Sequence, residues 1–222
     1  MVVPPLSKWT PALLQVFFHW LYHGGAWAYD GVAALASMGR WTRWVTRVLD
    51  QVEGTWVLEL GHGPGHLLAA MARQGLRPVG LDPSPAMGQR ARRRTGSSVP
   101  LVRGRAQALP FRDEVFDTVV ATFPAPFIRD PRTWQEAARV LRPGGRVVVV
   151  FAAQPPPSLL GVLWRWLYRL AGLQPPKGLL GAFLHDPARQ AGLEVEPWTF
   201  PDGGWTLHGI LARRPFHPCE RA

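Results

Sequence analysis

The spacing of apolar residues changes near residue 55 of this 222-residue chain. Before that point they recur every three to four positions, which predicts helices over 13–21, 33–38 and 41–49. After it, short apolar runs that predict strands alternate with amphipathic stretches that predict helices. The expected strands are 56–60, 78–81, 99–102, 118–122, 146–152, 193–198 and 205–212, and the expected helices are 67–73, 84–94, 131–141 and 187–191. This alternation is typical of an α/β fold with a doubly wound, mostly parallel sheet.

Two stretches fall outside the alternation. Residues 1–54 contain only predicted helices and many aromatic residues, so we expect an N-terminal helical cap before a main domain of residues 55–222. Residues 155–185 open with three prolines and contain a predicted helix at 159–170, which indicates a helical lid insert. The last two strands are joined by the short turn 201–204, so we expect them to pair antiparallel.

Composition limits the classes of protein that the chain can belong to. Apolar residues make up 47%, which fits a globular protein and excludes a disordered chain. The single cysteine, Cys219, excludes a disulfide framework and a cysteine-based zinc site. The best candidate for a membrane span, residues 9–29, is broken by Pro, Gln, His and Gly residues, and no signal-peptide pattern precedes it. We therefore expect a cytoplasmic protein, with contact to a membrane surface left open.

The net charge of the chain is +10, from 25 Lys and Arg residues against 15 Asp and Glu residues. A basic surface is typical of proteins with an anionic partner, such as nucleic acid or anionic lipid. Nearly all of these basic residues are arginine, and Ala, Gly and Pro are also abundant. A compositional bias of the genome therefore accounts for much of the charge without any partner, and we favour this interpretation.

A glycine-rich turn follows the first predicted strand. Gly61, Gly63 and Gly65 alternate there, which lets the backbone bend sharply and approach a ligand closely. A dinucleotide-binding fingerprint would need glycine at His66, and a P-loop would need a Gly-Lys pair followed by Ser or Thr. The acidic residue before the turn, Glu59, would repel a pyrophosphate but suits a cationic ligand.

Asp82 stands at the end of the second predicted strand. A carboxylate at this place can accept hydrogen bonds from both hydroxyls of a ribose. The alternative is that Asp82 caps the helix that begins near Pro83. Ser84 could serve as that cap instead, so we favour the ribose-binding role.

These motifs together resemble the class I S-adenosylmethionine-dependent methyltransferases. The resemblance covers residues 55–152, and its order and spacing agree throughout. It is carried by Glu59-x-Gly61-x-Gly63-x-Gly65, Asp82-x-Ser84-x-x-Met87, Leu109-Pro110-Phe111 before Phe116-Asp117, and Leu141-Arg142-Pro143-Gly144-Gly145. It implies a Rossmann-like sheet of seven strands in the order 3-2-1-4-5-7-6, with strand 7 antiparallel.

The resemblance also implies which residues bind the cofactor, S-adenosyl-L-methionine. The glycine turn would lie beneath its methionine part, Glu59 would help to place the ammonium group, and Asp82 would hold the ribose. Related sequences often carry an acidic residue that reads the adenine amino group, where this chain has Arg105. Because a guanidinium accepts no hydrogen bond, the backbone N–H of Ala106 would serve instead. The full expected set is Tyr29, Glu59, Gly61, His62, Gly63, Gly65, Asp82, Pro83, Met87, Ala106, Gln107, Thr122 and Phe123.

The acceptor side of the expected site is apolar. Residues 122–127 after the fourth strand should face the methyl group, and they carry neither an Asn/Asp-Pro-Pro-Tyr/Phe motif nor an acidic residue. The stretch 26–44 resembles the corresponding region of the ubiquinone and menaquinone C-methyltransferases and related phospholipid methyltransferases, in which Tyr29 would lie over the cofactor. The alternative is that Tyr29 and its neighbouring tryptophans form only the core of an amphipathic helix.

The sequence therefore predicts methyl transfer to a small, hydrophobic, quinone-like or lipid-like acceptor, without a metal ion. Two alternatives stay open: an RNA methyltransferase that uses the basic surface, and a cofactor-binding module without catalysis. The candidate catalytic residues are His19, His23, Tyr29 and His185. The sequence does not indicate an oligomeric state.

Overall fold

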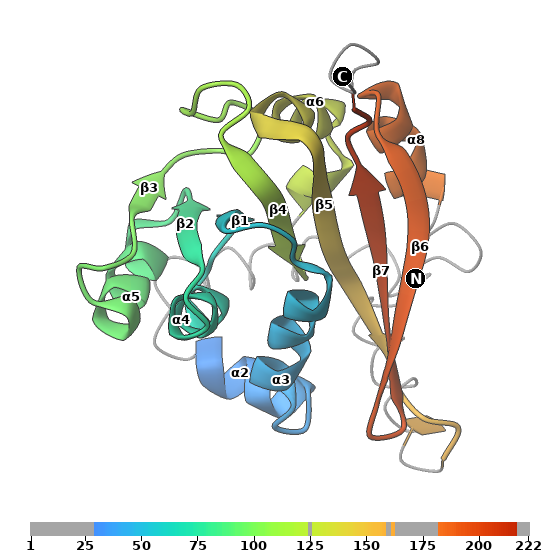
Figure 1. Ribbon diagram of the computed structural model, residues 1–222. Helices are drawn as coiled ribbons and strands as arrows, with labels where there is room; N and C mark the ends of the chain where they lie inside the picture. Colours follow the sequence, from blue (N-terminus) through green and yellow to red (C-terminus); the bar gives the residue numbers. More distant parts are fainter. Residues whose placement is uncertain (1–28, 124–125, 159–160, 163–181, 217–222) are drawn as a thin grey trace, which may run out of the picture.

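A computed structural model of the chain describes all residues except 1–28, 124–125, 159–160, 163–181 and 217–222. Its centre is a seven-stranded sheet in the order β3-β2-β1-β4-β5-β7-β6 (Figure 1). The strands are β1 (Trp56–Leu60), β2 (Arg77–Asp82), β3 (Leu101–Arg103), β4 (Phe116–Thr122), β5 (Leu141–Gln154), β6 (Glu194–Asp202) and β7 (Trp205–Arg213). Among the described strands, β7 pairs antiparallel with both β5 and β6, and the other pairs are parallel, so the expected Rossmann-like order is confirmed.

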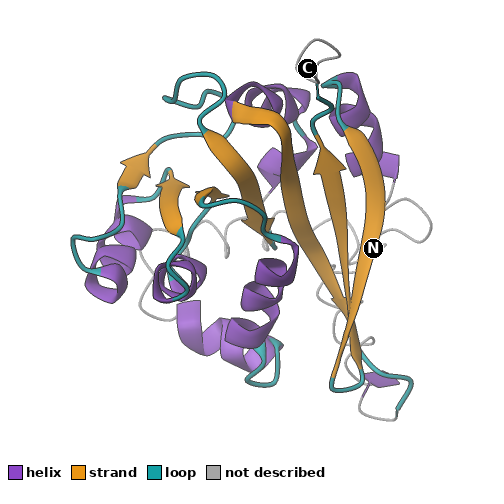
Figure 2. Cartoon of the chain, in the orientation of Figure 1, coloured by secondary structure: helices purple, strands orange, loops and turns teal. Residues whose placement is uncertain are grey.

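Helices cover both faces of this sheet (Figure 2). Helices α3 (Trp41–Thr46) and α4 (His66–Arg73) pack on one face, together with α2 (Tyr29–Ala36) and α5 (Pro85–Thr95). Helices α6 (Pro131–Val140) and α8 (Ala182–Gln190) pack on the other face. Two 3₁₀ helices, η3 (Arg47–Gln51) and η4 (Pro126–Arg129), complete the described connections.

Successive residues of the central strands are buried in different cores. In β5, Val147 and Val149 pack toward α6, whereas Val148 and Val150 pack toward α3 and α4. Because successive side chains of a strand point to opposite faces, a strand covered on both sides reads as a continuous apolar run. This explains why the valine run in β5 signals a central strand of the sheet.

Some elements begin or end elsewhere than the sequence pattern predicts. The helix expected over 41–49 splits into α3 and the 3₁₀ helix η3, because the chain tightens before it turns into β1. The helix expected over 187–191 begins already at Ala182, with Pro187 inside it. Most of the expected lid insert, and the helix expected over 13–21, lie outside the described residues.

The Pro143-Gly144-Gly145 segment is not the free turn that its composition predicts. It belongs to β5, where the pairing with β4 steps from Phe116–Leu141 to Thr118–Arg146, so that residues 142–145 bulge out of the ladder. The bulge pairs with the C-terminal segment, since Gly144 N–H donates to Arg214 O and Arg214 N–H donates to Gly145 O. Tertiary pairing thus replaces the local turn.

The described part of the N-terminal cap is joined to the sheet by Asp202 at the β6–β7 turn. The Asp202 side chain is fully buried, and its Oδ2 accepts a hydrogen bond from Trp44 Nε1 at 3.1 Å. Arg43 Nε lies 2.5 Å from Oδ1, and Arg40 Nη1 lies 3.6 Å from Oδ2. The Trp44 ring also packs on Trp205, with ring centroids 4.9 Å apart. A polar and an aromatic contact therefore dock α3 on the last hairpin.

We predict that Asp202→Ala lowers the free energy of unfolding by about 1–3 kcal/mol, because it leaves the buried Trp44 N–H without its acceptor. Asp202→Asn keeps an acceptor in place and should lose less. Urea unfolding of both variants measures the difference. Equal stability of Asp202→Ala and the unchanged protein would contradict this docking role.

Candidate functional site

The glycine turn lies at the carboxyl end of β1, directly before α4. Gly61, Gly63 and Gly65 have φ values of 71°, 51° and 82°, which side chains rarely adopt. A Cβ atom on Gly65 would lie 2.9 Å from the Cβ of Ala91, so glycine also permits the close approach of α4 and α5. The turn therefore needs glycine for both its conformation and its packing.

Asp82 connects this turn to the start of α5. Its Oδ2 accepts a hydrogen bond from Gly63 N–H at 3.0 Å, and its Oδ1 accepts one from Ser84 N–H at 2.8 Å. The cap of α5 is Ser84, whose hydroxyl accepts from Met87 N–H. Each carboxylate oxygen can accept a second hydrogen bond, so Asp82 retains acceptor capacity toward a ligand.

Glu59 is a buried acid with an unpartnered oxygen. It lies on β1, it is 2% exposed, and its Oε2 has no hydrogen-bond partner among the described residues. Burial, with a smaller contribution from the charge of Asp82, raises the pKa of Glu59 well above its ordinary value. A cation placed next to Glu59 would stabilise its ionised form. Without a cation, burial favours the protonated, neutral form of Glu59.

His62 is a buried residue of the glycine turn that lies close to Asp82. Its Nδ1 lies 2.7 Å from Gly63 O, which fixes Nδ1 as the donor of that hydrogen bond. Burial lowers the pKa of His62 in spite of the nearby charge of Asp82. The imidazole is therefore neutral at physiological pH.

Two cavities are lined in part by Glu59, His62 and Asp82. The smaller one, about 20 Å³, is lined by Trp41, Val45, Glu59, Gly61, His62, Gly63, Pro64, His66, Leu67 and Thr122. The larger and more open one, about 520 Å³, is lined by His62, Asp82, Ser84, Pro85, Gly88, Gln89, Arg92, Arg93, Leu101, Val102 and Arg103. Because the smaller cavity has room for about one water molecule, a larger group at Glu59 needs movement of its walls.

An aromatic cluster adjoins the small cavity. Trp41 of α3, which lines the cavity, packs on Phe123 with ring centroids 4.8 Å apart, and Trp44 lies 6.1 Å from the same ring. Phe123 follows β4 with φ = 45°, an uncommon conformation for a bulky residue. Glu59 and Trp41 thus both line the small cavity, and Trp41 connects it to the aromatic cluster.

Other expected cofactor residues lie in different surroundings. Residues 104–108 form a tight loop beside Asp82, in which Gly104 N–H donates to Asp82 O at 3.4 Å and Ala106 is buried. Gln107 of this loop is half-buried, and Pro83 is exposed. Met87 is fully buried and lines neither cavity.

The candidate catalytic residues are only partly described. His19 and His23 lie outside the described residues, as do the side chains of His185 and Tyr29. The backbone of Tyr29 begins α2, and that of His185 lies in α8. Within the described residues, no three His, Cys, Asp or Glu side chains form a metal-binding group. No helix in that part of the chain is long and apolar enough to cross a membrane.

Sequence reasoning missed Asp30, which ties α2 to the glycine turn. Its Oδ1 lies 2.9 Å from His66 Nε2, and its Oδ2 accepts from Arg90 at 2.8 Å and Arg94 at 3.1 Å. Arg94 also donates to Pro64 O within the turn. Burial raises the pKa of Asp30, but the hydrogen bonds from His66 and Arg90 lower this pKa further, so that it lies below its ordinary value. Its place next to Tyr29 in the Tyr-Asp pair was the only sequence signal.

Comparison with known proteins identifies similar sequences. A family model for a methyltransferase domain matches residues 58–149. A demethylmenaquinone methyltransferase of Thermus thermophilus is 33% identical, over 72% of this chain and 78% of that protein. A demethylmenaquinone methyltransferase of Clavibacter sepedonicus is 37% identical, over 60% of this chain and 57% of that protein. The match thus spans a little over half the length of the Clavibacter protein.

Solved structures share the fold. A chain from the complex of the Trm112 methyltransferase activator of Haloferax volcanii has a TM-score of 0.61 at 25% identity, over 86% of this chain and 96% of that one. Phosphoethanolamine N-methyltransferase 2 of Haemonchus contortus, in complex with S-adenosylhomocysteine, has a TM-score of 0.56 at 18% identity, over 80% and 53%. The [4+2]-cyclase SpnF has a TM-score of 0.56 at 20% identity, over 80% and 82%.

We predict that the affinity for S-adenosylhomocysteine rises with pH. A ligand ammonium group beside Glu59 favours the ionised carboxylate, so binding to the protonated free protein releases a proton. The affinity should increase by up to about tenfold per pH unit below the raised pKa of Glu59, and level off above it. Calorimetry from mildly acidic to mildly basic buffer measures this dependence.

Glu59→Gln is the matched control for this titration, because it keeps the size of the side chain and removes its proton equilibrium. His62, His66 and Asp82, the other titratable acids and imidazoles that line the two cavities, stay in place in this variant. A pH profile that is the same in Glu59→Gln and in the unchanged protein would assign the titration to another group.

Proposed function

The chain belongs to the class I S-adenosylmethionine-dependent methyltransferases, and we propose that it transfers a methyl group to a small, hydrophobic, quinone-like acceptor. The cofactor of this family is S-adenosylmethionine. The observation that carries the proposal is the small cavity, which is lined by both the acid Glu59 and Trp41, whose ring packs on Phe123 outside the lining. One wall suits a cationic cofactor, and the other suits an apolar acceptor.

Residues on the cofactor side have separate tasks in this proposal. Glu59 fits the group, because its buried Oε2 lacks a partner among the described residues and a cation would supply one. Asp82 accepts hydrogen bonds from the ribose hydroxyls through its remaining lone pairs. The space beside Gly63 lets the ligand approach the backbone, since a Cβ atom added there would meet no described atom within 4 Å.

The cofactor supplies an activated methyl group when it is bound, so the protein has mainly to align the acceptor and to exclude water. Trp41 and Phe123 form an apolar surface for that purpose, and Thr122 lies at its edge. The demethylmenaquinone methyltransferases of Thermus thermophilus and Clavibacter sepedonicus support a quinone-like acceptor by their names. The identity of the group that accepts a proton from the acceptor stays a prediction, and the candidates are Tyr29, His19, His23 and His185.

Contact with a membrane surface forms part of the proposal, because quinone-like acceptors are lipid-soluble. Leu35 in α2 and Met38 just after it are 76% and 52% exposed. They precede Arg40 and Arg43, which also pair with Asp202. Exposed apolar residues next to arginines suit the interface of an anionic bilayer.

An RNA acceptor is the second candidate. The exposed residues Arg92, Arg93 and Arg103 line the larger cavity, and the whole chain carries a net charge of +10. The affinity of an anionic polymer for these arginines would fall steeply as the salt concentration increases.

The function is tested by transfer of a labelled methyl group to a demethylated naphthoquinol in anionic vesicles, and in parallel to RNA. We expect label in the quinone fraction and co-sedimentation of the protein with the vesicles. Label in RNA, with binding that weakens steeply as salt increases, would establish the second candidate. Cofactor binding without label in either fraction would favour a non-catalytic cofactor-binding module.

We also predict that deletion of residues 1–24 impairs methyl transfer while the affinity for S-adenosylhomocysteine changes by no more than about twofold. The deletion keeps α2, Asp30 and every described residue that lines the two cavities. It removes the apolar, aromatic start of the N-terminal cap, which we propose forms a lid over the acceptor together with the 155–185 insert. Calorimetry and the transfer assay separate the two effects. Full activity of the truncated chain would refute the lid.

A further inference from the structure

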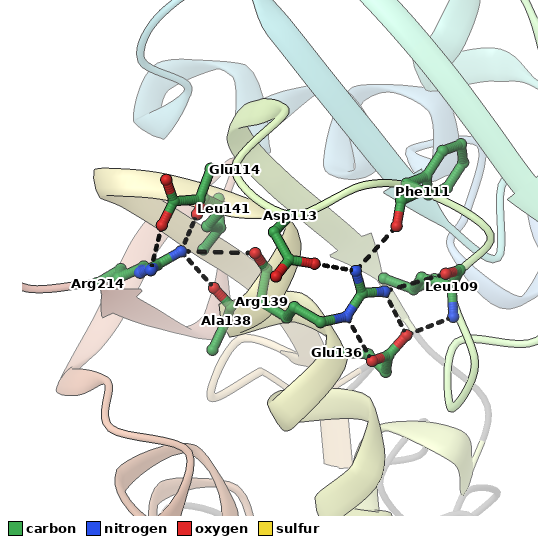
Figure 3. A network of polar contacts seen from close by, with 9 residues as sticks. All are labelled: Leu109, Phe111, Asp113, Glu114, Glu136, Ala138, Arg139, Leu141 and Arg214. Atoms are coloured by element: carbon green, nitrogen blue, oxygen red, sulfur yellow. Dashed lines mark hydrogen bonds and ion pairs between the residues drawn. The ribbon is translucent and has the colours of Figure 1, made fainter.

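Arg139 and Glu136 form a paired clamp on one turn of α6 (Figure 3). Arg139 Nε donates to Glu136 Oε1 and Arg139 Nη2 donates to Glu136 Oε2, both at 2.7 Å. This two-bond geometry is the strongest form of an arginine–carboxylate pair. The hydrogen bond from Arg139 lowers the pKa of Glu136, and that from Glu136 raises the pKa of Arg139, so both groups stay charged over the physiological range.

The remaining hydrogen bonds of the pair go to the segment between β3 and β4. Leu109 N–H donates to Glu136 Oε2 at 2.7 Å, and Leu109 O accepts from Arg139 Nη2 at 3.0 Å. Arg139 Nη1 donates to Phe111 O at 2.8 Å and to Asp113 Oδ1 at 2.7 Å. All five N–H groups of the guanidinium thus have acceptors, and both backbone groups of Leu109 are held by the same pair.

The clamped segment continues directly from the loop beside Asp82. Residues 104–108 begin at Gly104, which bonds to the backbone of Asp82, and close with the bridge between Arg105 and Ala108. The structure describes every residue from 104 to 115 and has no helix or extended strand among them, so this loop takes its position from contacts outside itself. Leu109, the residue after the loop, is where the clamp fixes it.

Recognition of the adenine base depends on the backbone of residues 104–108, because no acidic side chain at position 105 accepts a hydrogen bond from the adenine amino group. Arg105 cannot accept a hydrogen bond from an adenine amino group, so recognition of the base falls to main-chain groups such as Ala106 N–H. A backbone N–H cannot adjust by changing its rotamer, so its position follows that of the loop.

We propose that Glu136 and Arg139 are positioning residues that hold residues 104–109 so that their backbone reads the adenine base of the cofactor. This proposal rests on the proposed function, because it requires that the cofactor binds beside Asp82. It adds two residues that lie outside both cavities and that act only through the loop.

The test compares the affinity for S-adenosylhomocysteine with that for its inosine analogue, in which N1 carries a hydrogen and a carbonyl replaces the amino group. The unchanged full-length protein should prefer the adenosine compound. In Arg139→Ala the affinity for the adenosine compound should fall about fivefold to tenfold, while that for the inosine compound changes little. The preference ratio therefore falls toward one.

Arg214→Ala is the matched structural control. Arg214 donates to the backbone oxygens of Ala138, Arg139 and Leu141 at the end of the same helix and pairs with Glu114, so it contacts neither the Arg139 guanidinium nor residues 104–111 (Figure 3). This variant should lower the melting temperature but keep the preference ratio. If Arg139→Ala does not fold, Glu136→Gln provides the same test, because its amide cannot accept at both oxygen positions.

The outcomes are distinguishable. A preference ratio that stays unchanged in Arg139→Ala and Glu136→Gln would falsify the clamp, as would an unchanged protein that binds both compounds equally. Absence of binding to either compound by the unchanged protein would instead overturn the proposed function on which the clamp rests.

Discussion

The carboxylate of Asp82 joins the two loops on which the whole site depends. By accepting from Gly63 N–H and Ser84 N–H, it fixes the glycine turn after β1 and the start of α5 after β2. The parallel pairing of β1 and β2 brings these loops to the same edge of the sheet. Glu59 differs from Asp82, because its Oε2 lacks such a donor among the described residues and its pKa rises. The site thus holds one acid with compensating donors and one that favours an added cation.

Two further carboxylates attach α2 and α3 to the rest of the described structure. Asp30 extends from α2 to His66, Arg90 and Arg94, whereas Asp202 extends from the last hairpin to α3. The described cap helices are short, with 8 residues in α2 and 6 in α3, so their position depends on these attachments. The wall of the small cavity that α3 contributes consists of Trp41 and Val45. Trp41 is the side chain in that wall that lies against Phe123.

The sequence pattern predicts the sheet well because its signals are local. Buried parallel strands such as β5 read as apolar runs, and alternating glycines after a strand mark the turn. The contacts of Asp30, by contrast, join residues 36 to 64 positions apart, and the Trp44–Asp202 bond joins residues 158 positions apart. No spacing rule indicates such pairs. The bulge at Gly144 was mispredicted for the same reason, because its partner Arg214 is far away in the chain.

The fold alone does not determine the reaction, since SpnF, a [4+2]-cyclase, shares it with the phosphoethanolamine N-methyltransferase. What distinguishes such proteins has to lie in the walls of the site rather than in the sheet. In this chain the family match begins within β1 and ends within β5, so it includes Glu59, Asp82 and Phe123 but not Trp41 or the β6–β7 hairpin. The aromatic pair therefore combines Phe123 of the matched residues with Trp41 of α3, which the match does not cover. Asp82 holds the glycine turn and the start of α5 through contacts that lie within the matched residues, whereas Asp30 holds the same region from α2, which the match does not cover.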